Sequence, residues 1–279
     1  MIDTPLGWFL LFGFGLFTGT LAGILGIGGG LLNVPALTLA GATTLQAAAT
    51  SLIGVLLSGL SGSIRNLQTG TLNWKVALIL GGFGLMSAQV GSWLGASIPD
   101  AFLSIGFAVL ALTTIYLMGL KRSLVREQGH KGAGEQGSGG AGEQGEAVSG
   151  TERERRYPFV PTMGIGVLAG MLSGLFGVGG GAVMVPLQML ALNEPIKIAV
   201  RTSLGAIVAI ASSALIRQSI SGHVLWIPGL CLGGGAIIGA QFGTRLLPKL
   251  SDKTITTLFR LLLLGLSSYM LLRGIKALG

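Results

Sequence analysis

The feature that most limits the possible folds is a set of long apolar runs that carry almost no charge. Leu6–Leu25, Val76–Ile98 and Ile255–Leu272 are each long enough to cross about 30 Å of hydrocarbon at a rise of about 1.5 Å per residue. Charged residues make up 10% of the 279 positions, whereas soluble domains carry about 25%. A soluble protein would have to bury several such runs in one core. The sequence therefore predicts an all-α protein that crosses a lipid bilayer many times.

One stretch of sequence occurs twice. Gly19–Gly30 (GTLAGILGIGGG) aligns with Gly170–Gly181 (GMLSGLFGVGGG), and a proline follows each run at the same distance, at Pro35 and Pro186. Later matches stay in register after a gap of one residue. We interpret residues 1–120 and 159–279 as two homologous membrane repeats.

Between the repeats, residues 121–158 are rich in Gly, Ser and Glu, and the hexapeptide GAGEQG occurs there twice. Such a composition buries too little apolar surface to offset the entropy lost on ordering. We expect this segment to be a flexible cytoplasmic linker.

The basic residues favour opposite orientations for the two repeats. Cytoplasmic loops of membrane proteins carry an excess of Lys and Arg. A parallel duplication with a cytoplasmic linker would place five cations outside the cell, namely Lys197, Arg201, Arg245, Lys249 and Lys253. We therefore expect inverted repeats with both termini outside. Such repeats are a common architecture of transporters.

Each half reads as an apolar run, a short segment after the glycine motif and three further helices, which gives about 8–10 membrane segments. The first run and the short segment Leu31–Ala42 either both cross or form a re-entrant hairpin whose glycine tip reaches the midplane. We favour the hairpin because this segment is short for a span.

The two glycine motifs are the main candidate for a substrate site. Glycine permits unwound backbone, and successive N–H groups can form an anion-binding nest at the start of the following helix. Matching interruptions in two repeats are typical of a transporter's binding site. The alternative is tight helix packing by small residues. The candidate backbone positions are Gly28, Gly29, Gly30, Gly179, Gly180 and Gly181.

Three amide side chains join the candidate site. Gln89 and Gln241 lie at equivalent positions inside predicted helices, where they either donate to an oxyanion or form interhelical hydrogen bonds. Asn33 follows the first glycine motif, but its counterpart is Met184, so any role for this amide is asymmetric.

Hydroxyl and guanidinium groups also recur in the two halves. Arg65 and Arg217 either anchor helix ends by snorkelling or contribute positive potential to the site. Four hydroxyls lie where we predict helix starts, so they either cap those helices or contact substrate. These are Thr50, Ser51, Thr202 and Ser203.

The distribution of acidic residues favours an anionic substrate. All ten lie in predicted loops, in the linker or at segment ends, whereas cation carriers usually need a carboxylate within the membrane. Cys231 is the single cysteine, and the two histidines lie in predicted loops. We therefore expect no metal, no cofactor and no enzymatic activity. The net charge of +8 fits cytoplasmic loops, so we expect no nucleic-acid partner.

Taken together, these motifs resemble the TauE/SafE family of sulfite and organosulfonate exporters, of the 4-toluene sulfonate uptake permease type. The resemblance rests on the duplicated GxGGG-x4-P segments, on the Thr-Ser-Leu that follows each, and on Gly70…Trp74 with Gly222…Trp226. It covers nearly the whole chain except the linker.

The resemblance implies a multi-pass inner-membrane permease that exports a small sulfur-containing anion such as sulfite, thiosulfate or sulfoacetate. The anion is expected to bind near the midplane between the repeats. The alternative is a passive anion channel or a permease for another small anion. The sequence makes no prediction about oligomeric state.

Overall fold

A computed structural model describes residues 4–132 and 158–278, with side chains for 4–117 and 158–276. The described part is helical, and its elements follow one another as α1 (Pro5–Leu25), α2 (Gly30–Leu39), α3 (Thr44–Gln68), α4 (Trp74–Ser97), α5 (Asp100–Gly132), α6 (Phe159–Phe176), α7 (Gly181–Ala191), α8 (Ile196–Ile220), α9 (Trp226–Leu246), the 3-10 turn η1 (Leu247–Lys249) and α10 (Asp252–Leu278).

Eight of the described helices are long and apolar enough to cross a membrane, and α2 and α7 are the two shorter ones. The predicted all-α polytopic fold is therefore confirmed. α5 continues as a helix to Gly132, so it includes the first part of the predicted linker. Residues 133–157 of that linker lie outside the described residues.

α1 packs along α9, a helix of the other sequence half. Any side chain at Gly15, Gly19 or Gly23 would overlap the backbone of α9 at Leu232, Ala236 or Ala240, respectively. The glycines of α9 at 235, 239 and 243 face the α1 backbone in the same way. Glycines four residues apart allow two helix backbones to approach closely, so α1 and α9 run parallel in tight contact.

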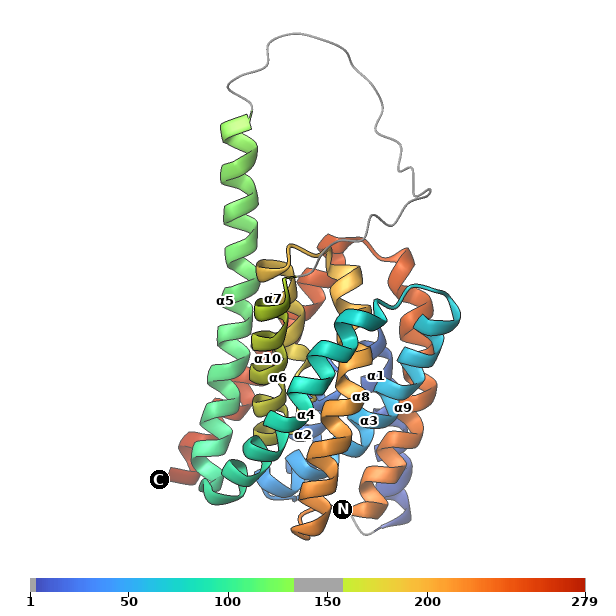
Figure 1. Cartoon of the computed structure of the whole chain (residues 1–279). Helices are drawn as coiled ribbons and strands as arrows, with labels where there is room; N and C mark the ends of the chain where they lie inside the picture. The colour runs from blue at the N-terminus through green and yellow to red at the C-terminus, as the bar shows by residue number, and fades with distance from the viewer. Residues whose placement is uncertain (1–3, 133–157, 279) are drawn as a thin grey trace.

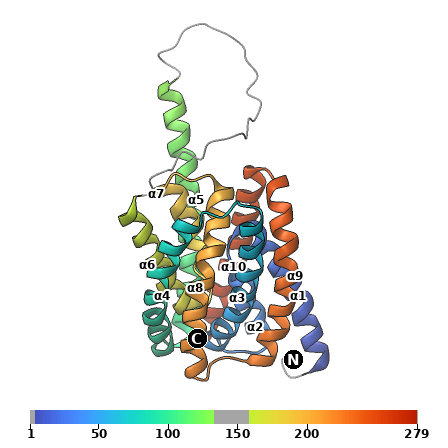
Figure 2. The ribbon, with the colours of Figure 1, turned by 45° about the vertical axis from the view of Figure 1, so that its right-hand side comes forward.

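α6 packs along α4 by the same device. Side chains at Gly166, Gly170 and Gly174 would meet the backbone of α4 at Leu80, Gly84 and Ala88. The first helix of each half thus packs against a helix of the other half. Figure 2 shows α1 beside α9 at one edge of the bundle and α4 beside α6 at the other.

α3 and α8 form the centre of the bundle. In α3, 78% of the spanning window is buried, and in α8 61%, against 39–50% for the other six spans. The two helices cross antiparallel, because Gly59 of α3 faces Ile207 of α8 while Gly62 faces Leu204. Elements that touch both central helices are therefore deep inside the molecule.

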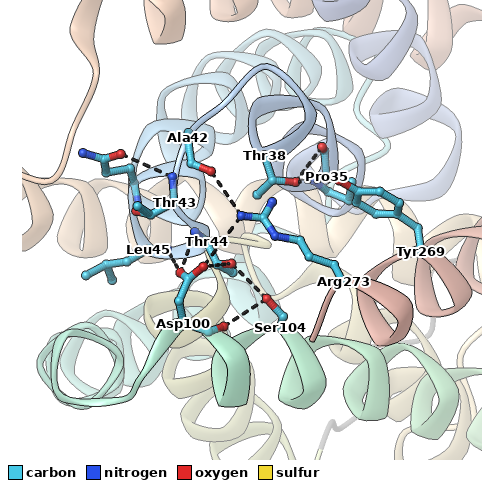
Figure 3. Close-up of polar contacts among 11 residues, drawn as sticks. Pro35, Thr38, Ala42, Thr43, Thr44, Leu45, Asp100, Ser104, Tyr269 and Arg273 are labelled. Carbon is cyan, nitrogen blue, oxygen red and sulfur yellow. Dashed lines mark hydrogen bonds and ion pairs between the residues drawn. The ribbon is translucent and has the colours of Figure 1, made fainter. Parts of the chain in front are cut away.

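Asp100, at the start of α5, joins three elements at one end of the bundle (Figure 3). Its carboxylate accepts hydrogen bonds from the backbone N–H of Thr44 at 2.6 Å and of Leu45 at 3.3 Å, which start α3. Arg273 of α10 lies 3.7 Å from the same carboxylate and donates to the Ala42 carbonyl oxygen at 3.3 Å. The turn between α2 and α3 is therefore held to α5 and α10.

α1 begins and α10 ends at one end of the bundle, whereas α5 ends at the opposite end (Figure 1). The bond from Arg273 to Ala42 places the α2–α3 turn at the first end too. α2 therefore returns toward the end at which α1 begins, as the hairpin interpretation expects. With 10 residues, α2 is about 15 Å long and cannot span the bilayer.

Candidate functional site

Two glycine breaks separate α1 from α2 and α6 from α7. α1 ends at Gly26 with φ 70°, and the chain continues through Gly28 and Gly29 with φ 76° and 79° before α2 begins. Gly179 and Gly180 repeat this conformation with φ 80° and 74°. Glycine adopts the left-handed region without the steric penalty that other residues meet there. The glycines are therefore required by the backbone, as the sequence predicts.

The two breaks contact each other inside the bundle. A Cβ atom on Gly30 would lie 2.5 Å from the carbonyl oxygen of Gly177, and one on Gly181 would overlap the carbonyl oxygen of Gly26. Gly28 faces Val55 of α3 and Ile207 of α8, and Gly179 faces the same two side chains. Val55 and Ile207 lie about halfway along their helices. The breaks thus meet near the middle of the molecule.

Serine hydroxyls donate hydrogen bonds to carbonyl oxygens of both breaks. Ser51 of α3 donates to the Gly177 oxygen at 2.6 Å, and Ser203 of α8 donates to the Gly26 oxygen at 2.8 Å. Each serine thus binds the break of the other half. Ser58 of α3 also donates to a break oxygen, that of Gly28 in its own half, at 2.9 Å. These oxygens are therefore already engaged as hydrogen-bond acceptors.

The backbone N–H groups of the breaks have no such partners. Among the described residues, no hydrogen bond uses the N–H of Gly28, Gly29, Gly179 or Gly180 as donor, and all four glycines are buried. The N-termini of α2 and α7 begin directly after them. Buried N–H groups without partners next to a helix N-terminus form an environment that favours an anion.

Asn33 brings a side-chain amide to the first break. It is fully buried, and neither Nδ2 nor Oδ1 has a hydrogen-bond partner among the described residues. A Cβ on Gly54 would lie 2.7 Å from Nδ2, so the absence of a side chain there makes room for the amide. A Cβ on Gly29 would lie 3.5 Å from the same nitrogen. The counterpart Met184 is buried in an apolar cluster, so the asymmetry expected from the sequence is present.

Of the two roles considered for the four hydroxyls, helix capping is wrong. α3 begins at Thr44 with Thr43 as its N-cap, and α8 begins at Ile196. Thr50, Ser51, Thr202 and Ser203 therefore lie well inside these helices. Thr50 accepts the Leu225 N–H at 2.9 Å. The Thr202 hydroxyl is fully buried and has no partner in the described part of the chain.

The two glutamines form interhelical hydrogen bonds, which is the alternative stated for them. Gln89 Nε2 donates to the hydroxyl of Ser213 at 2.7 Å and to its carbonyl oxygen at 2.9 Å. Gln241 Nε2 donates to both oxygens of Ser61 at 2.9 Å. In this conformation neither amide faces the glycine breaks as a free donor.

Arg65 and Arg217 lie in the last turns of α3 and α8. Each is partly exposed. Arg65 follows Val55 by ten positions, which corresponds to about 15 Å along the helix. The structure therefore places both cations at helix ends and away from the breaks.

The sequence alone does not predict the positions of some buried polar groups. Ser58 reaches the first break from the middle of α3, and its only sequence signal is a hydroxyl inside an apolar run. Gln188 of α7 is fully buried, and its amide has no partner among the described residues. Glu194 lies in the α7–α8 connection, as expected for an acidic residue, but it is fully buried.

The space beside the first break is small. A cavity of about 10 Å³ lies against Thr18, Ala22, Ile27 and Gly29, which is room for about one water molecule. No group of three or more His, Cys, Asp or Glu side chains that could hold a metal occurs in the described ranges. The bundle is therefore closed around the break in this conformation.

Among the described residues, eight helices long and apolar enough to span a membrane, with two glycine breaks that meet at mid-bundle, define a multi-pass membrane protein. The family model described as Sulfite exporter TauE/SafE matches residues 11–270, and the chain belongs to this family.

Several bacterial and archaeal proteins are similar to this chain. The probable membrane transporter protein YunE of Bacillus subtilis (strain 168) is 30% identical over 276 residues, which cover 94% of this chain and 96% of the relative. The probable membrane transporter protein MJ0441 of Methanocaldococcus jannaschii is 25% identical over 274 residues, with 92% and 93% covered. No solved structure matches the chain. Family and relatives together identify a membrane transporter.

Proposed function

We propose that this protein transports a small sulfur-containing anion, such as sulfite, thiosulfate or a sulfonate like sulfoacetate, and that the anion binds between the two glycine breaks. The observation that carries this proposal is the set of buried N–H groups at Gly28, Gly29, Gly179 and Gly180 that donate to nothing among the described residues. The unpartnered amide of Asn33 lies beside them.

The charge of the site supports a monoanion. A helix N-terminus carries the equivalent of about half a positive charge. α2 and α7 both begin at the breaks, so together they offer about one positive charge to a ligand held between them. An anion of one charge would be balanced there without an ionised side chain.

The engaged carbonyl oxygens argue against a cation. A dehydrated metal ion or ammonium group would need oxygen ligands, but the oxygens of Gly26, Gly28 and Gly177 already accept serine hydroxyls. The N–H groups of Gly28, Gly29, Gly179 and Gly180, in contrast, donate to no partner among the described residues. The arrangement therefore selects for ligands that accept hydrogen bonds.

The sulfur chemistry and the export direction come from the family and from energetics. The family model is described as a sulfite exporter, while the relatives are named only as probable membrane transporters. An inside-negative potential expels anions with about 2.3 kcal/mol per charge per 100 mV, which favours export. The closed space at the break favours a transporter over a channel that is open at rest.

Uptake into proteoliposomes tests this function together with the glycine site. We expect saturable uptake of sulfite or sulfoacetate that exceeds uptake of chloride and sulfate. Gly29→Ala should reduce it at least tenfold, because a methyl group at φ 79° strains the backbone by about 1–2 kcal/mol and reshapes the N–H groups.

Gly70→Ala is the matched control. Gly70 also has a positive φ, of 63°, and open space around it, but it lies at the end of α3. Its variant should keep the wild-type flux. Equal loss of flux in both variants would assign the effect to general backbone strain. Flux that does not saturate for any of the five anions tested (sulfite, sulfoacetate, thiosulfate, sulfate and chloride) would favour a channel.

A further inference from the structure

A second cavity lies on the membrane-facing side of the bundle, separate from the glycine breaks. It has a volume of about 440 Å³ and is lined by the second half of α3, the first half of α4 and the middle of α8. Its rim is apolar and open to the surroundings, since Ile64, Trp74 and Leu78 are 51%, 56% and 64% exposed. The volume falls within the range of about 300–1,000 Å³ that is typical of small-molecule pockets.

Along the floor of the cavity, α8 has small residues where α3 has large ones. Gly205 and Ala209 form part of its floor, and their counterparts in the first half are Ile53 and Leu57. On the opposite side of the molecule, Ile53 fills the corresponding space against Gly229 and Gly233 of α9. The duplicated fold therefore has this cavity on one side and a packed interface on the other.

The position of the cavity along the helices identifies its occupant. It runs from Leu60 to the end of α3 and to Trp74 at the start of α4. Tryptophans at helix ends are typical of the headgroup layer of a bilayer. A flexible hydrocarbon chain entering from that layer would meet only apolar side chains, apart from the hydroxyl of Ser63, along the cavity.

Two cations stand at the headgroup end. Arg65 follows Ile64 of the rim, and Lys75 follows Trp74. The counterpart of Lys75 in the second half is Ile227, so only the arginine of this pair has a basic counterpart, Arg217. Paired Lys and Arg side chains near a bilayer surface attract anionic lipid headgroups.

We propose that the cavity binds one acyl chain of an anionic phospholipid, whose headgroup is held by Arg65 and Lys75. The bound chain lies against Gly205, Val208 and Ala209 of α8. In the sequence of α8, Ile207, which contacts both glycine breaks, lies between Gly205 and Val208. The lipid therefore supports the helix that positions the breaks. This site is independent of which anion the protein transports.

The duplicated tryptophans supply the test with an internal control. Trp74 and Trp226 are counterparts with similar exposures of 56% and 53%. Two full-length variants each retain one of them, with the other three tryptophans replaced by phenylalanine. The proteins are reconstituted in mixed vesicles that contain 10 mol% of either brominated phosphatidylglycerol or brominated phosphatidylcholine, with the other lipid unlabelled.

We expect brominated phosphatidylglycerol to quench Trp74 emission at least twofold more than brominated phosphatidylcholine does. Trp226 should be quenched equally by both. Replacing Arg65 and Lys75 by glutamine should remove the preference at Trp74. Gly82→Leu fills the cavity from a position with open space and should lower quenching of Trp74, whereas Gly265→Leu, at an exposed helical glycine of α10, should not.

Equal quenching of both tryptophans by both lipids would overturn the proposal. So would a preference that persists without the two cations. Protection of Trp74 from both lipids, together with disulfide cross-linking of a Leu78→Cys variant to a second copy, would instead identify the cavity as an interface between two chains.

Discussion

The side-chain amide of Asn33 is buried but contributes no hydrogen bond to the described part of the fold. A buried amide without partners destabilises the folded state by about 1–3 kcal/mol, and Asn33 is fully buried without a partner among the described residues. Met184 shows that an apolar side chain fits the equivalent position of the other half. The unpartnered amide therefore supports the proposal that an anion binds next to Gly29.

Replacing Asn33 by leucine, which has a similar shape, should separate the two roles. We expect the apparent melting temperature in detergent to stay the same or to rise, because an unsatisfied polar group is removed. Anion uptake should fall at least tenfold. A variant that is destabilised but still transports at the wild-type rate would show that Asn33 serves the fold.

At this scale the sequence predicted the glycines well and the hydroxyls poorly. A positive φ is a property of a single residue, so a glycine motif indicates it directly. The role of a hydroxyl depends on where its helix begins. Thr43 and Gln46 form a capping box at the start of α3, and this signal would have placed Ser51 two turns inside the helix. That Ser51 binds the break of the other half depends on packing that no local pattern contains.

Among the helices, the start of α3 depends on Asp100. The carboxylate satisfies two N–H groups in the first turn of α3, and the hydroxyl of Thr44 also donates to it at 2.9 Å. Orphan N–H groups at a helix start must find partners outside the helix. Arg273 brings α10 to the same point. Asp100 therefore holds together α3, α5 and α10.

Asp100→Ala should destabilise the protein by about 1–2 kcal/mol, the usual effect of losing an N-terminal cap. Asp252→Ala is the control at the counterpart position, where the side chain is 61% exposed and lies 4.0 Å from Lys197. Its loss should change stability by less than about 0.5 kcal/mol. Thermal unfolding in detergent provides the comparison, and equal shifts for both variants would contradict the capping role.

The sequence indicated which helices exist but not which ones touch. Glycine spacing in α1 and α9 is visible in the sequence, and small residues four apart favour close helix contacts. The contact itself joins Gly15 to Leu232. A pattern within one helix does not name its partner. The tight packing that we considered as the alternative for the glycine motifs is present at Gly30 and Gly181 of the motifs as well as along α1 and α9.

Across the whole molecule, the two central helices α3 and α8, which the sequence alignment predicts to be counterparts, cross antiparallel. This arrangement supports the inverted repeats that the basic residues favour. It also follows that neither sequence half is a structural unit by itself, because α1 and α6 each lie against a helix of the other half.

The orientation has a direct test at two exposed counterpart positions, Thr69 after α3 and Ser221 after α8. In a Cys231→Ala background, a cysteine at position 69 should react with an impermeant maleimide only from the cytoplasmic side. A cysteine at 221 should react only from outside. Labelling of both from one side would contradict the inverted arrangement and favour parallel repeats.

Because α1 packs against α9 and α6 packs against α4, the order of synthesis determines which of these two helix pairs can form first. When α6 enters the membrane, its partner α4 is already there, so that pair can close at once. α1 ends at Leu25 and α9 begins at Trp226, so about 200 residues are made in between, which takes about 10–40 s at about 5–20 residues per second. During that time the glycine face of α1 lacks its partner α9. The α4–α6 pair can therefore form well before the α1–α9 pair does.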